Sequence, residues 1–185
     1  GAHNARNAAG ALEVARLVGI ADSARTAIAG FTGAARRFQR LGRTASGAVV
    51  IDDYAHHPTE VAATLNAART LGPKRLIAVF QPHLYSRTAL LAEEFGAALS
   101  IADIVVVLDV YPARERVEDH PGVSGETLVR SALACAQGRE VLWRASFDEA
   151  RETLDELLED GDLCLVMGAG DVDVLGRGLV GDDGL

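Results

Sequence analysis

The chain has 185 residues, of which 49% are hydrophobic and 24% are charged, and its formal net charge at pH 7 is −8. This is the composition of an ordinary globular protein, long enough for one domain or for one domain and a piece of another. It excludes a disordered tail, a collagen-like repeat and a disulfide-stabilised miniprotein. No apolar run approaches the roughly 18 residues that span a membrane, so no membrane partner is expected. The negative charge argues against a general nucleic-acid surface.

Two further features bear on location and completeness. Cys135 and Cys164 lie in apolar patterns without a CxxC spacing, which predicts reduced thiols in the core of a cytoplasmic protein. The first residues lack the basic and then apolar order of a signal peptide. The only methionine is Met167, so we expect this chain to be a fragment of a longer protein.

From about residue 45 the sequence alternates between strand-like and helix-like segments. The residues from Ala48 to Asp52 predict a strand. Pro58 then opens a helix, because the N–H that proline lacks has no partner in a first helical turn. Gly72 and Pro73 end this helix, and the apolar run from Leu76 to Phe80 predicts the next strand.

Serines are expected to begin the later helices. Ser86 and Ser124 can each cap a helix, and Ser146 with Glu149 has the spacing of a capping box. Three more strands are predicted, at residues 103–110, 140–144 and 163–167. The apolar positions of the four helices are Val61, Leu65, Ala68 and Leu71; Leu91, Phe95 and Ala98; Val129, Leu133 and Ala136; and Ala150, Leu154, Leu157 and Leu158.

Strands that are apolar throughout and alternate with amphipathic helices predict an α/β fold, a Rossmann-like open and mostly parallel sheet covered by helices. Residues 1–38 differ, because they contain two helical patterns, Asn4 to Leu17 and Ala21 to Ala29, with no strand between them. They resemble the tail of a preceding domain, which leaves residues 39–185 as the α/β domain. The segment from Phe38 to Gly42 is expected to add an edge strand.

In open α/β sheets, ligands bind beyond the carboxyl ends of the strands, and polar clusters follow several predicted strands here. Arg36 and Arg37 carry guanidinium groups that match phosphate oxygens, although such a pair is more often solvated surface. Asp53 could accept from ribose hydroxyls or serve as a turn residue. His3 and Asn7 share one helical face, where an amide can meet a purine edge or simply face solvent.

Histidines and one arginine complete the set of candidates. His56 and His57 could bind a metal, but loop and capping roles are favoured, because adjacent histidines rarely point at one ion. His83 and Arg87 are four residues apart, and Arg87 could hold a carboxylate with two hydrogen bonds or form an ion pair at a helix start. The turn from Gly168 to Gly170 lacks the third glycine of a dinucleotide motif, and no Gly-Lys-Ser/Thr sequence of a P-loop occurs.

Taken together, these motifs resemble the C-terminal part of the Mur ligase family. The matching segments are GAHNARNA (1–8), FTGAARRF (31–38), DDYAHHPTE (52–60), FQPHLYSRT (80–88), VYPARE (110–115) and GAGD (168–171). Within the family, the resemblance is nearest to the member that joins L-alanine to UDP-N-acetylmuramate, an early step of peptidoglycan synthesis.

The resemblance implies a three-domain enzyme, in which residues 1–38 end the central ATP-binding domain and residues 39–185 form the third domain. It implies that ATP phosphorylates the lactyl carboxylate of UDP-N-acetylmuramate and that L-alanine attacks the acyl phosphate. The P-loop, the UDP site and the Mg²⁺ ligands would lie in the N-terminal and central domains. No metal ligand is expected in residues 1–185, and this chain alone should be inactive.

The resemblance also implies roles for individual residues. His3 and Asn7 would flank adenine with support from Asn4, Asp53 would hold the ribose, and Arg37 would contact the terminal phosphates with Arg36 beside it. His83 and Arg87 would face L-alanine and the muramoyl end, and His56, His57 and Tyr111 could line the site. Leu84 stands where many relatives have arginine, which leaves Arg87 as the expected cation for the amino acid.

Two alternatives remain open. A sister ligase that attaches a recycled peptide to the same UDP-sugar should share most of these motifs, although the FQPHLYSRT segment (80–88) favours the alanine-adding enzyme. A stand-alone nucleotide-binding module without chemistry is compatible with the absence of a P-loop. A P-loop encoded upstream would decide for the ligase.

Overall fold

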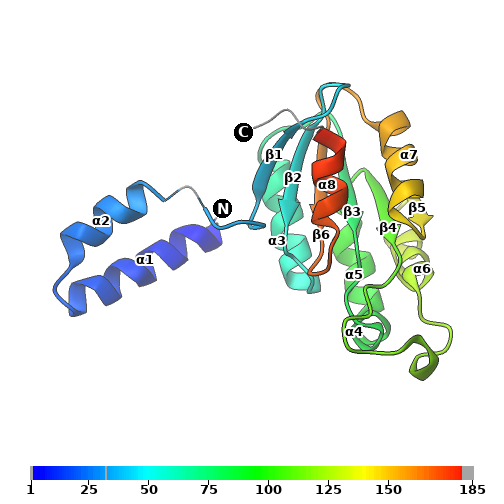
Figure 1. The fold of residues 1–185 in the computed structure, drawn as a ribbon, viewed down its shortest axis with the longest axis horizontal. Coiled ribbons are helices and arrows are strands. Elements are labelled where there is room, and N and C mark those ends of the chain that lie inside the picture. The colour runs from blue at the N-terminus through cyan, green and yellow to red at the C-terminus, as the bar shows by residue number, and fades with distance from the viewer. Residues whose placement is uncertain (1, 32, 181–185) are drawn as a thin grey trace. The chain divides into compact units, whose positions relative to one another are not determined.

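A computed structural model describes residues 2–31 and 33–180, except the side chains of residues 2–4, and the chain divides into two compact units, Gly1–Ala34 and Ala35–Leu185. The first unit consists of helices α1 (Ala2–Leu17) and α2 (Ala21–Ala29), which lie side by side (Figure 1). The second unit is a sheet with helices on both faces. None of the helices in the described part of the chain is long and apolar enough to cross a membrane.

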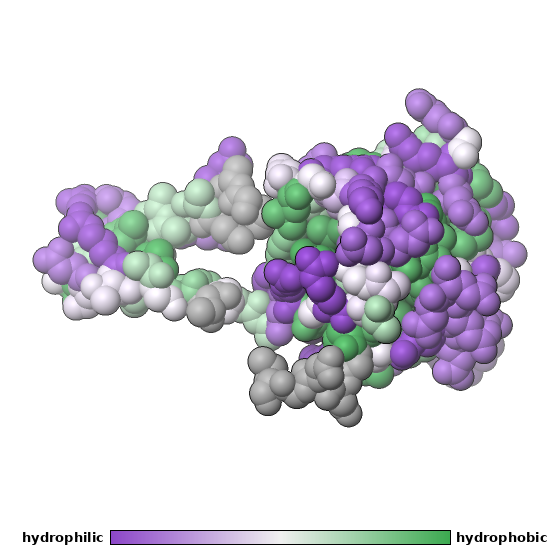
Figure 2. All heavy atoms as spheres, turned by 90° about the horizontal axis from the view of Figure 1, so that it is seen from above, coloured by the Kyte–Doolittle hydropathy of each residue, from purple (hydrophilic) through white to green (hydrophobic). Residues whose placement is uncertain are grey.

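The helical pair of the first unit has almost no core of its own. Ala15 is its one buried hydrophobic residue among the described side chains, whereas Leu17 and Phe31 are 71% and 70% exposed and Val14 and Val18 are also exposed. Figure 2 shows hydrophobic residues at the surface of these helices. An amphipathic helix normally buries its apolar side chains against a neighbour, and this pair alone leaves most of them uncovered.

The second unit contains a six-stranded sheet with the order β1-β2-β6-β3-β4-β5. The edge strand β1 pairs antiparallel with β2, and all other pairs are parallel, which confirms the predicted mostly parallel Rossmann-like sheet. The strands are β1 (Gln39–Arg43), β2 (Val49–Asp53), β3 (Leu76–Phe80), β4 (Ile104–Leu108), β5 (Glu140–Arg144) and β6 (Leu163–Met167).

Helices cover both faces of this sheet (Figure 1). One face packs against α3 (Pro58–Arg69), α5 (Ala92–Leu99) and α6 (Gly125–Cys135), and the other packs against α7 (Phe147–Leu157) and α8 (Asp173–Val180). This arrangement gives two cores, and successive residues of each buried strand alternate between them.

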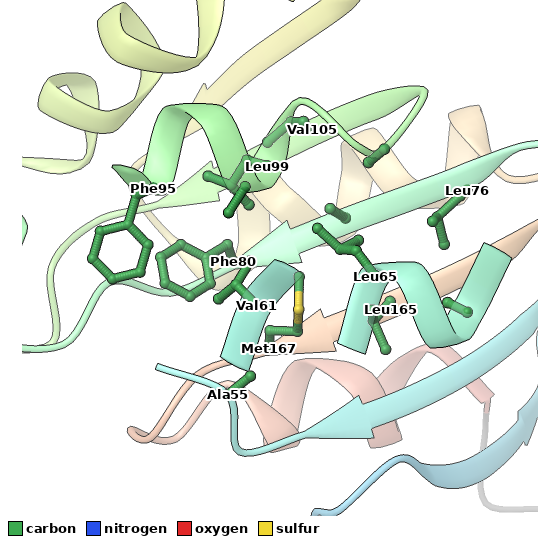
Figure 3. Close-up of a cluster of buried hydrophobic side chains, with 14 of the residues drawn as sticks. Ala55, Val61, Leu65, Leu76, Phe80, Phe95, Leu99, Val105, Leu165 and Met167 are labelled. Atoms are coloured by element: carbon green, nitrogen blue, oxygen red, sulfur yellow. The ribbon is translucent and has the colours of Figure 1, made fainter. Parts of the chain in front are cut away.

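The core beneath α3 and α5 contains the large aromatic residues. Phe80 from β3 and Phe95 from α5 lie with their ring centroids 5.2 Å apart, and Leu65 and Met167 lie in the same cluster (Figure 3). The core on the other face is aliphatic and is built around residues such as Leu154 of α7. Burial of these side chains is the main force that holds the helices on the sheet.

Most of the predicted helix starts are confirmed. His57 precedes Pro58 and caps α3, with its Nδ1 accepting from the Thr59 N–H at 3.3 Å. Ser124 and Ser146 each form a capping box. The predicted apolar stripes need two corrections, because Leu71 and Leu133 are exposed. In α6 the fully buried hydrophobic residues are Leu128 and Ala132, whereas the predicted Val129 packs against the core while partly buried and the predicted Ala136, at the C-cap, is buried.

The prediction that Ser86 caps a helix is wrong. Helix α4 (Tyr85–Leu90) begins one residue before Ser86, and a break at Leu91 separates it from α5. Leu84 occupies the N-cap position with φ of 72°, and its N–H donates to the Tyr111 carbonyl at 3.0 Å. The Ser86 hydroxyl instead donates to Glu115, so it is not available as a cap.

The topology creates a switch point at the carboxyl edge of the sheet. Strands β3 and β6 are neighbours, but the chain leaves β3 toward α4 and α5 on one face and leaves β6 toward α8 on the other. Such a reversal is where open α/β sheets bind ligands. Backbone bonds join the strand ends here, since Gln81 N–H donates to Met167 O at 2.9 Å and Gly168 N–H donates to Asp53 O at 3.2 Å.

Candidate functional site at the carboxyl edge of the sheet

Arg36 binds three segments of the chain together. Its guanidinium donates to Gly170 O at 2.8 Å, to Gly168 O at 2.7 Å and to the Asp52 carboxylate at 3.2 Å. It also lies 3.4 Å from Asp173. The Arg36 side chain is 18% exposed and Asp52 is 1% exposed, so this ion pair is largely buried. Most of the hydrogen-bonding capacity of Arg36 is therefore used within the protein.

Arg37 differs from its neighbour. Its side chain is exposed, and its guanidinium carbon lies 5.5 Å from the centroid of the Tyr54 ring. The Arg36 guanidinium carbon lies 5.1 Å from the same ring. Among the described residues, Arg37 has no hydrogen-bond acceptor, so its cation faces outward and is held in place by the aromatic ring.

Asp53 lies at the end of β2 and is 6% exposed. One carboxylate oxygen accepts from the Phe38 N–H and the other from the Ala55 N–H, both at 2.8 Å. Burial raises the pKa of this carboxyl above its ordinary value, against the lowering effect of these hydrogen bonds and of Arg37. Asp53 thus fastens the turn that carries Arg37 to the end of β2.

His56 and His57 follow the same strand and have separate surroundings. The Nδ1 atom of His56 lies 2.9 Å from Tyr54 O and 3.4 Å from the Glu60 carboxylate. The ring of His57 is occupied as the cap of α3. The described residues hold no group of three or more histidines, cysteines or carboxylates arranged to bind a metal.

His83 follows β3 and stacks on Tyr111, which follows β4. The two ring centroids are 5.6 Å apart at an interplanar angle of 16°, and the backbones of the two residues form a parallel bridge. The His83 Nδ1 atom is buried without a hydrogen-bond partner in the described part of the chain. Burial, together with Arg87, lowers the pKa of His83 below its ordinary value, so the ring is neutral at pH 7.

Arg87 lies in the first turns of α4. Its Nη1 atom is buried and has no acceptor among the described residues. A guanidinium nitrogen in this position is unfavourable until an acceptor reaches it, and a carboxylate or phosphate oxygen is the acceptor with complementary charge. Movement of the side chain toward such a ligand would satisfy it.

The turn after β6 completes the site, and Gly170 is required there for lack of space. A Cβ atom at Gly170 would lie 2.5 Å from the Gln81 side-chain oxygen and 2.7 Å from the Tyr111 ring. The Gln81 amide donates to Asp171 at 2.9 Å and holds the turn against the end of β3. The glycines serve close packing here, as the sequence predicted for a tight strand-to-helix turn.

These contacts form a closed ring at the carboxyl edge of the sheet. Its members, in order, are Arg36 with Arg37, Tyr54, His56, His83, Tyr111 and Gly170, which returns to Arg36. The ring places the exposed cation of Arg37 near the end of β2. Near the end of β3 it places the neutral ring of His83, with the cation of Arg87 beside it. Tyr54 and Gln81 belong to the DDYAHHPTE (52–60) and FQPHLYSRT (80–88) segments, although no role was predicted for them. Their position directly after a buried strand was the available signal.

The three residues predicted to contact adenine lie in the first unit. His3 and Asn4 lie in α1, but their side chains are outside the described residues. Asn7 is described and is exposed on α1. The predicted contacts of these three residues with adenine therefore stay predictions.

Comparison with known proteins identifies the family. The model of the Mur ligase glutamate ligase domain matches residues 36–170, which is more than half of the chain. The chain belongs to the Mur ligase family. This confirms the resemblance, and every residue of the ring lies within or at the border of the matched region.

Similar Mur ligases are known in several bacteria. A UDP-N-acetylmuramate–L-alanine ligase of Mycolicibacterium smegmatis is 51% identical over 180 residues, which cover 95% of this chain and 36% of that protein. The chain thus spans little more than a third of this curated relative. The crystal structure of UDP-N-acetylmuramate–alanine ligase from Thermotoga maritima superimposes with a TM-score of 0.76 at 26% identity, covering 96% of this chain and 37% of that one.

A murein peptide ligase from Psychrobacter arcticus shares the fold. Its crystal structure superimposes with a TM-score of 0.71 at 24% identity, covering 97% of this chain and 36% of that one. The fold therefore does not separate the alanine-adding Mur ligases from the peptide-adding ones, and the distinction depends on the sequence of the site.

Proposed function

We propose that this chain is the C-terminal portion of a UDP-N-acetylmuramate–L-alanine ligase, a cytoplasmic enzyme that uses ATP and Mg²⁺ to join L-alanine to the UDP-sugar during peptidoglycan synthesis. The observation that carries the proposal is 51% identity over 95% of the chain to a ligase of this name. The P-loop, the UDP site and the Mg²⁺ ligands are assigned to the remainder of the enzyme.

The two structural units fit this division of labour. We assign residues 1–38 to the end of the central ATP-binding domain and residues 39–185 to the third domain. The exposed Leu17 of α1 and Phe31, which follows α2, support the first assignment, because apolar side chains of this size are expected to pack against further structure. His3, Asn4 and Asn7 would contact adenine from this unit.

The end of β2 suits the polyphosphate of ATP. The guanidinium of Arg37 is exposed and donates to no described protein group. Its donors are therefore free to bind a phosphate. Arg36 lies next to Arg37 in the sequence. Asp53 already accepts from two backbone N–H groups, so a ribose hydroxyl would donate to the remaining lone pairs of its carboxylate. Positive charge here stabilises the charge that builds up on the transferred phosphoryl group.

The end of β3 suits the amino acid. The carboxylate of L-alanine supplies the acceptor that the buried Nη1 atom of Arg87 lacks. His83 is neutral at pH 7, so it can lie near the incoming amine without repelling it. The amine nitrogen would attack the acyl carbon, and the oxygen that had been phosphorylated would leave with the phosphate. His56, His57 and Tyr111 would line the space between these two sides.

Arg87→Lys in the complete enzyme should raise KM for L-alanine about tenfold or more, since lysine keeps the charge but loses the planar pair of donors. KM for ATP should barely change. Steady-state kinetics with each substrate varied in turn provide the measurement. A rise in KM for ATP with an unchanged KM for L-alanine would place Arg87 on the nucleotide side.

The 185-residue chain alone should release no phosphate above background from ATP, UDP-N-acetylmuramate and L-alanine. It should bind ATP no more tightly than about 1 mM, because it lacks the P-loop that holds the phosphates. A coupled phosphate assay and titration calorimetry measure these quantities. Substrate-dependent turnover or micromolar binding by the chain alone would show that the nucleotide site has been misplaced.

The complete enzyme allows a direct choice between the two ligase activities. Phosphate release should depend on L-alanine and saturate with it, and a tripeptide that begins with L-alanine should be a poor substrate at the same concentration. The reverse preference would identify the sister ligase. Nucleotide binding without turnover on either acceptor would favour a module without chemistry.

A further inference from the structure

The first turn of α4, which contains Arg87, has no cap of its own. The first N–H groups of a helix need acceptors from outside the helix. The residue at the N-cap position is Leu84, whose side chain can accept nothing. Leu84 also has φ of 72° and ψ of 130°, an unfavourable conformation for leucine that persists only when the surroundings hold it.

Glu115, on the loop after β4, supplies the missing acceptor. One of its carboxylate oxygens accepts from the Ser86 N–H at 3.0 Å, and the other accepts from the Ser86 hydroxyl. These hydrogen bonds lower the pKa of Glu115 below its ordinary value, so the group is ionised at neutral pH. The Glu115 side chain is 19% exposed, with His120 Nε2 3.7 Å from its carboxylate.

The same loop holds the segment at two further points. The ring of His120 stacks on Tyr85 with centroids 5.8 Å apart. At the other end, Tyr111 N–H donates to Pro82 O at 2.8 Å, and Tyr111 O accepts from the Leu84 N–H at 3.0 Å. The loop from Tyr111 to His120 therefore fixes the chain from Pro82 to Ser86. This segment contains His83 and leads directly into Arg87.

We propose that Glu115 is a positioning residue for Arg87 and His83. By binding Ser86, it fixes the first turn of α4 and the strained Leu84 that precedes it, and it thereby sets the direction of the Arg87 side chain one residue later. The proposal rests on the proposed function for its substrate, L-alanine. Glu115 is not expected to touch the substrate.

Kinetics of the complete enzyme test this role. Glu115→Ala should raise KM for L-alanine about tenfold, because small displacements of a substrate-holding group have large effects, while KM for ATP should stay within about twofold. Glu115→Gln keeps an acceptor for the Ser86 N–H and should recover part of the loss. Glu118→Ala is the matched control, since Glu118 lies on the same loop, is 67% exposed and pairs with Arg116.

Hydrogen exchange on the 185-residue chain provides a readout that needs no substrate. In Glu115→Ala the amide of Ser86 should exchange at least about tenfold faster, with no change in the strands β3 and β4 or in Glu118→Ala. If Glu115→Ala does not fold, Ser86→Ala and Glu115→Gln test the same contact with smaller changes.

The outcomes separate this proposal from the proposed function. If the unmodified complete enzyme does not use L-alanine, the proposed function fails, and the exchange result still decides whether Glu115 holds α4. If the enzyme uses L-alanine but Glu115→Ala leaves both its KM and the exchange of Ser86 unchanged, the positioning role is overturned. Equal increases in KM for ATP and for L-alanine would also overturn it.

Discussion

Arg36→Ala should lower the free energy of unfolding of the 185-residue chain by about 3 kcal/mol, as expected when one partner of a buried ion pair is removed. The other partner, Asp52, is 1% exposed, and its Oδ1 atom has no hydrogen-bond partner in the described part of the chain. Without Arg36, the buried charge of Asp52 has lost its paired cation. The carbonyls of Gly168 and Gly170 lose their donors as well. Urea unfolding followed by circular dichroism measures the change.

The pH dependence of this loss has a definite sign. Burial already raises the pKa of Asp52 above its ordinary value in spite of Arg36, and removal of Arg36 raises it further. When the pKa of a carboxyl is higher in the folded state than in the unfolded state, protonation of that carboxyl stabilises the folded protein. The free energy of unfolding lost in Arg36→Ala should therefore become smaller as the pH falls from 7 toward 5. Arg40→Ala is the control, because Arg40 is an exposed arginine on β1. Equal losses in both variants at every pH would contradict a structural role for Arg36.

Arg37→Ala in the complete enzyme should lower kcat at least about 100-fold, which is the size of effect seen when a group that stabilises developing charge is removed. KM for ATP should change less, because the contact strengthens as the phosphoryl group is transferred. Its position on Tyr54 keeps the guanidinium in place without using its donors. Stopped-flow or steady-state assays at saturating ATP measure kcat.

Two controls accompany this variant. Arg37→Lys retains a charge and should recover part of the rate, whereas Arg40→Ala should leave the rate unchanged. Thermal unfolding should show that Arg37→Ala is folded, because Arg37 is exposed and donates to no described residue. A pure rise in KM for ATP with an unchanged kcat would show that Arg37 binds the ground state and the transition state equally.

The sheet and most helix starts could be predicted from the sequence because their causes are local. A five-residue apolar run such as Leu76–Phe80 is typical of a strand buried on both faces, and Ser146 with Glu149 caps a helix from within four residues. The start of α4 could not be predicted. Its acceptor, Glu115, lies 29 residues along the chain from Ser86, and no local pattern records that distance.

The candidate site was predictable in composition but not in arrangement. The sequence placed Arg36 and Arg37 together as phosphate-binding candidates, yet the structure gives them different surroundings. The acceptors of Arg36 are backbone carbonyls 132 and 134 residues away, and a carbonyl leaves no trace in the choice of amino acid. The stacking of His83 on Tyr111 has the same origin, since it follows from the adjacency of β3 and β4.

In the proposed reaction, the complete enzyme activates a carboxylate by phosphorylation and then joins it to L-alanine. The most direct test uses the complete enzyme with UDP-N-acetylmuramate whose lactyl carboxylate carries ¹⁸O in both oxygens. Mass spectrometry should find one labelled oxygen in the inorganic phosphate and the other in the amide carbonyl of the product, in amounts that match the ADP formed. Product whose formation leaves the inorganic phosphate unlabelled would contradict this reaction.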